Sequence, residues 1–533
     1  MTKAYKIILA FVLTIALSGI QSNWAQNTLS PADLLGLKAA RVHSLSPDGE
    51  ELIYAVYTPR GPNEKPGGSH LEYLRINIAT KESKPLFEED IKGGSPHFSP
   101  DGKYISFTYK KEEDARQVWA IPVNGGDMIQ LTNADNGVIS YKWQPDGKAL
   151  AYISSEAKTD KEKELEDRGY DFIYYEENIK KNHLYIAQLD KELKLVETTG
   201  LVSEMHIWDF EFSPDSKMLA FSTSKENLID HRYMFRKINI LDLQSGEIIY
   251  EVENEGKLGN YTFNEKATQL AFSAAFNIND HQVSQAFTYS LKDKTIKNHT
   301  PPNFRGHVSW VGWKNNEELY FYSGEGVYPK FSSISIKGGE RKVILDAQES
   351  VVIFGTPLIS ADGKIFVFTG TTPTDYYNVY TWNGKGELNK LTDLNPVLAN
   401  RELGEQEVFQ YEARDGQEIE GILIKPVGYQ KGEKYPLVLY VHGGPESHHN
   451  NGWLSRYSTP GQVMAGKGYM VAYINYRAST GYGVDFAMEG FKDPAGKEFD
   501  DLADGIEYLV AEKAADRERV GMAGGSYGGY ASA

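Results

Sequence analysis

Residues 519–530 read RVGMAGGSYGGY, and within them Gly524-Gly525-Ser526-Tyr527-Gly528 forms a G-x-S-x-G pentapeptide. In this pattern a serine lies on a sharp turn between a strand and a helix, where its hydroxyl stands clear of a sheet. The apolar run 520–523 predicts a buried parallel strand before the turn. Glycines at 524 and 528 suit a turn in which a Cβ atom would clash. The stretch therefore predicts a nucleophile elbow, with Ser526 as the attacking group of acyl-transfer chemistry.

The residues upstream of the elbow predict alternating strands and helices. Tyr435–Val441 and Tyr469–Tyr476 read as core strands, and a short helix is expected around Gln462–Ala465 between them. Glu498–Lys513 is amphipathic, with apolar residues at helical spacing. Strand, helix, strand, helix, strand and elbow follow one another in the order of an α/β-hydrolase. We therefore expect residues 396–533 to form the N-terminal part of an α/β-hydrolase domain.

The segment His442-Gly443-Gly444-Pro445 directly follows the first of these strands. Acyl transfer creates a negative substrate oxygen, which backbone N–H donors must stabilise. One donor is expected from Tyr527, the residue after the nucleophile, and the other from the loop after an earlier strand. Gly444 is the first candidate for the second donor and Gly443 is the alternative. A plain tight turn is the competing interpretation.

The region from residue 26 to residue 395 contains a repeated turn at intervals of about 45 to 55 residues, with one longer interval. The five clearest copies are Ser46-Pro47-Asp48-Gly49, Ser99-Pro100-Asp101-Gly102, Gln144-Pro145-Asp146-Gly147, Ser213-Pro214-Asp215-Ser216 and Ser360-Ala361-Asp362-Gly363. Degenerate copies begin at Phe263 and Trp313. Ser-Pro-Asp-Gly suits a type I turn between two strands. These units predict a β-propeller of about seven blades, followed by the partial α/β-hydrolase domain; an irregular β-sandwich is the alternative.

Four segments together resemble the prolyl oligopeptidase family of serine peptidases, with likeness to its acylaminoacyl-peptidase and dipeptidyl-peptidase branches. They are HGGP at 442–445, NYRASTGYG at 475–483, DDL at 500–502 and GGSYGGY at 524–530. The resemblance implies a serine peptidase that cleaves short peptides through an acyl-enzyme on Ser526, with a propeller that restricts access. Ala478 departs from the glycine usual in this family. A serine esterase on the same scaffold and a non-catalytic propeller binding module are the alternatives.

The resemblance places the aspartate and histidine of the catalytic triad well beyond the elbow. The sequence has 12 histidines, and none follows Ser526. We therefore expect both triad partners to lie past Ala533. Residues 1–533 alone are expected to be inactive, because a serine hydroxyl without a base is a poor nucleophile at neutral pH.

An insertion, residues 155–181, accounts for the longer interval in the repeat. Its first half is a run of charges, which predicts a solvated helix or loop. Its second half contains Tyr174-Tyr175-Glu176-Glu177-Asn178. Dipeptidyl-peptidase relatives use two glutamates on a propeller insertion to hold the substrate α-ammonium group by charge-assisted hydrogen bonds. Glu176 and Glu177 are therefore candidates for substrate binding, although an exposed strand end is the simpler interpretation.

The first 25 residues predict a secretory signal peptide. Lys3 and Lys6 precede the apolar run Ile7–Leu17, and Ala25 offers a cleavage point. The run is short for a membrane span, and a retained anchor is the alternative. A net charge of −17 argues against nucleic acids and anionic membranes as partners. Without cysteine or an H-E-x-x-H motif, we expect no disulfide, metal or cofactor in an exported, periplasmic or secreted protein.

Overall fold

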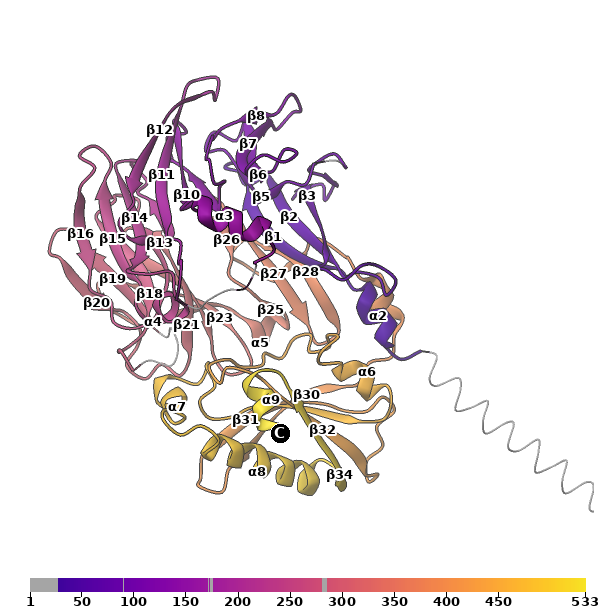
Figure 1. Ribbon diagram of the computed structural model, residues 1–533. Helices are drawn as coiled ribbons and strands as arrows, with labels where there is room; N and C mark the ends of the chain where they lie inside the picture. The colour runs from indigo at the N-terminus through magenta and orange to yellow at the C-terminus, as the bar shows by residue number, and fades with distance from the viewer. Residues whose placement is uncertain (1–26, 90, 171, 173–175, 280–284) are drawn as a thin grey trace, which may run out of the picture.

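Figure 1 shows the computed structural model, which describes residues 27–89, 91–170, 172, 176–279 and 285–533. The predicted signal peptide, residues 1–25, lies outside the described residues. A ring of antiparallel sheets, here called the propeller (residues 39–390), lies above a mixed sheet with helices, here called the α/β unit (residues 406–533). The predicted order of a propeller followed by an α/β-hydrolase domain is confirmed.

The propeller has seven sheets among the described residues, and all of their strand pairs are antiparallel. The first three sheets contain β1 (Ala39–Leu45), β2 (Glu51–Thr58), β3 (His70–Asn77), β4 (Ser83–Pro85); β5 (Gly94–Phe98), β6 (Tyr104–Tyr109), β7 (Gln117–Pro122), β8 (Ile129–Gln130); and β9 (Ser140–Trp143), β10 (Ala149–Ser155), β11 (Asn182–Leu189), β12 (Leu195–Val202). The next two contain β13 (His206–Phe212), β14 (Met218–Ser224), β15 (Lys237–Asp242), β16 (Ile248–Val252); and β17 (Leu258–Phe263), β18 (Gln269–Ala274), β19 (Gln285–Ser290), β20 (Thr295–Asn298). The last two contain β21 (His307–Asn315), β22 (Glu318–Gly324), β23 (Lys330–Ser335), β24 (Lys342–Asp346); and β25 (Ile353–Phe354), β26 (Leu358–Ile359), β27 (Phe366–Thr372), β28 (Asp375–Trp382), β29 (Asn389–Lys390).

Each repeated turn joins two neighbouring strands of one blade. In the first copy the Ser46 hydroxyl donates to the Asp48 carboxylate at 2.5 Å and accepts the Glu51 N–H at 2.9 Å. Ser99, Ser213 and Ser360 make the same pair of contacts in their own blades. The serine therefore caps the turn, which is why the repeat could be read from the sequence.

The ring closes by side-chain packing between the first and last blades. Leu52 and Val56 of β2 share a buried cluster with Val367 of β27 and Val379 of β28. The first described residues form α2 (Pro31–Gly36), whose buried Leu34 packs with a cluster that also contains residues of the α/β unit. The other propeller helices are α3 (Asp160–Asp167), α4 (Ile229–Met234) and α5 (Ala347–Ser350), and the 3₁₀ helix η1 (Pro396–Asn400) follows the last blade.

The α/β unit contains one five-stranded sheet with the order β30-β31-β33-β32-β34. β32 is parallel to both β33 and β34, whereas β30 and β31 form an antiparallel hairpin. Apolar residues along α8 pack on this sheet in one cluster. The elements are β30 (Gln406–Glu412), β31 (Glu418–Ile424), β32 (Tyr435–Val441), α6 (Gly461–Ala465), β33 (Met470–Asn475), α7 (Val484–Met488), α8 (Lys497–Glu512), β34 (Ala515–Gly524) and α9 (Tyr527–Ala531).

The predicted strand before the elbow differs from the observed one in length and burial. β34 begins at Ala515 rather than Val520, and Val520 and Met522 are half-buried instead of buried. The reason is its place in the sheet: among the described strands β34 pairs only with β32 and forms the edge. The charge run of the insertion forms the exposed helix α3, as predicted.

Candidate active site

The proposed nucleophile stands at the carboxyl end of β34. Val441 at the end of β32 pairs with Gly524 at the end of β34, and the two strands are parallel. The loops that follow both strands therefore leave the sheet at the same edge, where α/β sheets form their sites. Ser526 is exposed, with φ 54° and ψ −121°. A non-glycine residue pays about 1–3 kcal/mol for such a conformation.

The start of α9 packs directly on the end of β32. A Cβ atom at Gly528 would lie 2.0 Å from the carbonyl oxygen of Val441, so any side chain there would push the helix away from the strand. This close contact explains why the last position of the G-x-S-x-G motif must be glycine. The packing of the Gly528 backbone on Val441 also fixes the start of α9, and with it the position of Ser526.

The loop after β32 lies against the serine. A Cβ built on Gly443 would lie 3.1 Å from Cβ of Ser526 and 3.0 Å from the carbonyl oxygen of Gly525. Gly444 has φ 128°, a conformation that an L-residue rarely adopts, and is exposed. The structure thus brings together the candidates Ser526, Tyr527, Gly443 and Gly444. Whether Gly443 or Gly444 donates to the oxyanion stays a prediction.

The side chain and the backbone of His442 hold this loop in place through hydrogen bonds. Its Nδ1 lies 2.9 Å from the Gly443 carbonyl oxygen, and its Nε2 lies 2.9 Å from the Ser479 hydroxyl. The Tyr476 hydroxyl donates to the His442 carbonyl oxygen at 2.8 Å. Burial lowers the pKa of His442 to about 4, so the ring is neutral at pH 7. One ring nitrogen contacts the loop and the other contacts the NYRASTGYG segment, so His442 holds these two segments together.

The NYRASTGYG segment joins the loop to the propeller. The Thr480 hydroxyl lies 2.8 Å from Nδ1 of His448, and the Gly481 carbonyl accepts the Gly326 N–H at 2.7 Å. The ring of His448 meets the ring of His307 of β21 edge to face, with centroids 5.2 Å apart. These contacts place the loop after β32, and with it the serine, at the seam between the propeller and the α/β unit.

A second contact across the seam comes from the residue after the HGGP segment. Glu446 forms an ion pair with Lys257, which directly precedes β17 of the propeller. Desolvation by burial raises the pKa of Glu446, and Lys257 opposes this shift. A cavity of about 770 Å³ also opens at the seam. Both parts of the chain line it, among them Phe276, Phe304, Arg305, Tyr482, Val484 and Glu489.

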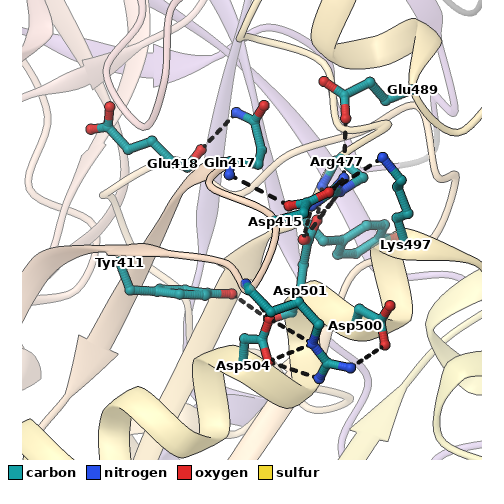
Figure 2. A network of polar contacts seen from close by, with 12 residues as sticks. Tyr411, Asp415, Gln417, Glu418, Arg477, Glu489, Lys497, Asp500, Asp501 and Asp504 are labelled. Carbon is teal, nitrogen blue, oxygen red and sulfur yellow. Dashed lines mark hydrogen bonds and ion pairs between the residues drawn. The ribbon is translucent and has the colours of Figure 1, made fainter.

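Arg477 is the buried centre of an ion-pair network, which Figure 2 shows. Its side chain is 1% exposed and its guanidinium bonds to Asp501 at 2.6 Å, Asp415 at 2.8 Å and Glu489 at 3.2 Å. The hydrogen bonds that Arg477 donates to Asp415 and Asp501 raise its pKa further above the ordinary value, so it stays charged. The network connects the turn after β30, the end of α7 and the first half of α8 behind the HGGP loop.

Sequence reasoning missed two acidic residues, of which Glu498 contacts the elbow itself and Asp415 contacts Arg477 of the NYRASTGYG segment. Asp415 lies in the turn of the β30–β31 hairpin, a segment in which no strand was predicted, and only tertiary pairing brings it to Arg477. Glu498 is 2% exposed in the first turn of α8 and accepts a hydrogen bond from the Tyr527 hydroxyl at 2.5 Å. Its spacing from Asp501, one helical turn along α8, is the only local signal that could have identified it.

The candidate substrate-binding residues Glu176 and Glu177 are exposed, on the segment between α3 and β11. Their neighbours Tyr174 and Tyr175 lie outside the described residues. The segment is tied to the start of α4 through Lys180, whose carbonyl accepts the Asn227 amide at 3.2 Å. Within the described residues, no recorded contact joins either carboxylate to the elbow. Their role stays a prediction.

No group of three or more histidine, aspartate or glutamate side chains among the described residues is arranged to hold a metal ion. None of the helices in the same residues is long and apolar enough to cross a bilayer.

Comparison with known proteins places the chain among peptidases. Residues 455–533 match the prolyl oligopeptidase family. An uncharacterized peptidase of Bacillus subtilis, YuxL, is 26% identical over 526 residues, which cover 90% of this chain and 78% of the relative. Dipeptidyl-peptidase 5 of Porphyromonas gingivalis is 23% identical over 534 residues, which cover 94% and 75% respectively.

A solved structure shows the same fold over nearly the whole chain. The acylaminoacyl peptidase of Pyrococcus horikoshii superposes with a TM-score of 0.74 and 20% identity, over 95% of this chain and 76% of its own length. The segment that carries the elbow is also the segment that matches the family. Residues 455–533 thus match the prolyl oligopeptidase family, and nearly the whole chain is similar to peptidases in sequence.

Proposed function

We propose that the protein cleaves short peptides through an acyl-enzyme on Ser526. The observation that carries the proposal is the pairing of β32 with β34, which sets the Gly443–Gly444 backbone beside an exposed, strained serine. The propeller supports the choice of short peptides, since the loop after β32 contacts it through Glu446 and His448. The propeller lies above the α/β unit, in which α9 directly follows the serine (Figure 1).

In the proposed reaction the Ser526 hydroxyl oxygen attacks the carbonyl carbon of the scissile peptide bond. The N–H groups of Tyr527 and of Gly444 or Gly443 hold the oxyanion of the tetrahedral intermediate. The carbon–nitrogen bond then breaks, and the proton from the serine leaves with the amine. A general base must carry that proton, and water then releases the acid from the ester. We assign the base to none of the described residues.

The substrate α-ammonium group is proposed to meet Glu176 and Glu177. Two carboxylates at the mouth of the site would hold an ammonium by charge-assisted hydrogen bonds. If so, the double variant Glu176→Gln/Glu177→Gln raises KM for peptides with a free N-terminus and leaves KM for N-acylated peptides unchanged. A KM of the variant for free-N-terminus peptides equal to that of the wild type would remove these residues from the site.

The test of the main proposal is a pair of substrate panels, aminoacyl nitroanilides and nitrophenyl esters, applied to the full-length protein and to Ser526→Ala. We expect the wild type to hydrolyse the amides and the variant to lose this activity. Hydrolysis confined to the esters would favour the esterase. A fluorophosphonate probe applied to residues 1–533 alone tests the expectation that this stretch is inactive; rapid labelling of Ser526 would contradict it.

We also propose that the protein is exported, as its first 25 residues suggest. Expression with and without residues 1–25, followed by fractionation, tests this. Export that persists after the deletion would show that the segment is not the signal.

A further inference from the structure

The side chain of Tyr527 is held by a buried carboxylate. Its hydroxyl donates to Oε1 of Glu498 at 2.5 Å, and the Ala495 N–H donates to the same Oε1 at 2.6 Å and to the Tyr527 hydroxyl oxygen at 3.1 Å. The ring of Tyr527 also meets Phe499 edge to face, at 6.2 Å between centroids. Burial, together with Glu498, raises the pKa of Tyr527 to about 12, so its hydroxyl remains a donor at neutral pH. Three groups thus fix one phenol.

This contact lies next to the strained part of the elbow. Gly524 and Gly525 precede Ser526 and have no side chains that could anchor the turn. Tyr527 is therefore the first residue next to the serine whose side chain can hold the backbone in place. Its N–H is also the proposed first donor of the oxyanion hole. Because hydrogen bonds weaken steeply when they are misaligned, fixing Tyr527 fixes the direction of that N–H.

The helix that supplies Glu498 also supports the second proposed donor. Asp501 lies three residues further along α8, on the same face, and is fully buried. It accepts the Arg477 N–H at 2.9 Å as well as the guanidinium. Arg477 lies in the NYRASTGYG segment, whose Ser479 and Thr480 contact His442 and His448 of the loop after β32. The first half of α8 therefore contacts Tyr527 through Glu498, and it contacts the segment that holds the second proposed donor through Asp501.

The second oxygen of Glu498 indicates that this carboxylate is not kept for stability alone. Oε2 is buried and has no hydrogen-bond partner among the described residues. A half-satisfied buried carboxylate costs free energy, so its presence calls for a functional explanation.

We propose that Glu498 is a positioning residue, which acts through the phenol of Tyr527 to aim the first oxyanion donor at the reacting carbonyl oxygen. With Asp501 it sets the spacing between the two donors. The proposal rests on the proposed function of Ser526. It adds a residue that touches neither substrate nor nucleophile but governs how well the transition state is held.

Tyr527→Phe is the sharpest variant, because it removes only the hydroxyl and leaves the N–H in place. Loss of one whole oxyanion donor lowers kcat by about 10²–10³-fold, so a misaligned donor should lower kcat by about tenfold. We expect KM to stay within about twofold, since the lost interaction forms only in the transition state. Tyr530→Phe is the matched control on α9, where the side chain is 56% exposed and contacts the same Phe499; its kcat should not change.

Two further measurements separate positioning from a structural role. A peptide aldehyde, which forms a tetrahedral adduct with the serine, should bind Tyr527→Phe more weakly by the same factor as kcat/KM falls. Glu498→Gln keeps an acceptor for the hydroxyl and should retain more activity than Glu498→Ala. The double variant Tyr527→Phe/Glu498→Gln should be no slower than the slower single variant, because both changes break one contact.

The possible failures are distinguishable. An Ser526→Ala protein that still hydrolyses the amides would overturn the proposed function. If Ser526→Ala is inactive but Tyr527→Phe and Glu498→Gln keep wild-type kcat and aldehyde affinity, the positioning role of Glu498 is wrong. A lower Tm in these variants with unchanged kcat would likewise reduce Glu498 to a stabilising contact.

Discussion

Two glycines of the elbow region predict opposite outcomes when each is replaced by alanine. Gly528→Ala would place its methyl group 2.0 Å from the Val441 carbonyl oxygen, so α9 must move and take the serine with it. Gly521 lies on the neighbouring strand β34 with open space around its Cβ position. We expect Gly528→Ala to abolish reaction of Ser526 with a fluorophosphonate in the catalytically active protein, and Gly521→Ala to react at the wild-type rate. Equal reaction rates of the two variants would contradict the close packing.

Ala478 occupies a position at which the resembled family usually has glycine. It has φ 75° and is 1% exposed, so the backbone is strained while the methyl group is well packed. The sequence showed the departure from the family pattern but not the conformation, because a left-handed residue in a loop has no periodic signal. At this position the strained backbone lowers the stability of the folded protein, whereas the packed methyl group raises it.

Ala478→Gly should therefore be nearly neutral. It relieves about 1–2 kcal/mol of left-handed strain, and it loses about 0.8 kcal/mol of buried methyl and about 0.4–1 kcal/mol through the freer unfolded chain. Ala472→Gly in β33, fully buried, has no strain to relieve and should cost about 1–2 kcal/mol. Urea unfolding compares the two free energies of unfolding. Equal losses in both variants would show that Ala478 is not strained.

At the scale of elements, helix α8 forms one buried ion pair and one largely exposed ion pair. Asp501 is fully buried against Arg477, whereas Asp504, one turn further along, pairs with Arg414, whose side chain is 56% exposed. Asp501→Asn removes the buried negative charge that pairs with the Arg477 guanidinium. It should lower the free energy of unfolding by about 3–5 kcal/mol. Asp504→Asn breaks a surface pair and should cost about 1 kcal/mol or less. A similar cost for both, measured by urea unfolding, would contradict the burial argument.

Elements with a strong local signal could be predicted from the sequence, and those that depend on tertiary pairing could not. β32 begins and ends where its apolar run does, and serine-capped turns mark four of the seven blades of the propeller. The β30–β31 hairpin and the five-residue α7 have no comparable signal, since short strands and helices are decided by their neighbours. The same holds within the site: Ser526 and the glycine pair lie in motifs, while Glu498 matters only because folding brings it to Tyr527.

For the whole molecule, the seam between the propeller and the α/β unit predicts how stability depends on pH. His307 of the propeller and His448 of the loop after β32 pack against each other there, and His442 begins that loop. Burial lowers the pKa of His307 to about 3, and those of His448 and His442 to about 4. In the unfolded chain a histidine binds its proton near pH 6.5. The unfolded state therefore binds more protons than the folded state between pH 6.5 and about 4, and acidification through this window favours unfolding.

Each of these histidines should contribute up to about 1.4 kcal/mol per pH unit to the slope of the free energy of unfolding against pH in that window. The free energy of unfolding is expected to fall steadily from pH 6.5 to pH 4.5, and His307→Gln should make the fall shallower because one titrating ring is removed. Since the largest cause of these shifts is desolvation, the slope should be nearly the same in low and high salt. Urea unfolding across the pH range provides the measurement. A stability that is flat over this window, or a slope that salt abolishes, would mean that the imidazoles at the seam are not held neutral by burial.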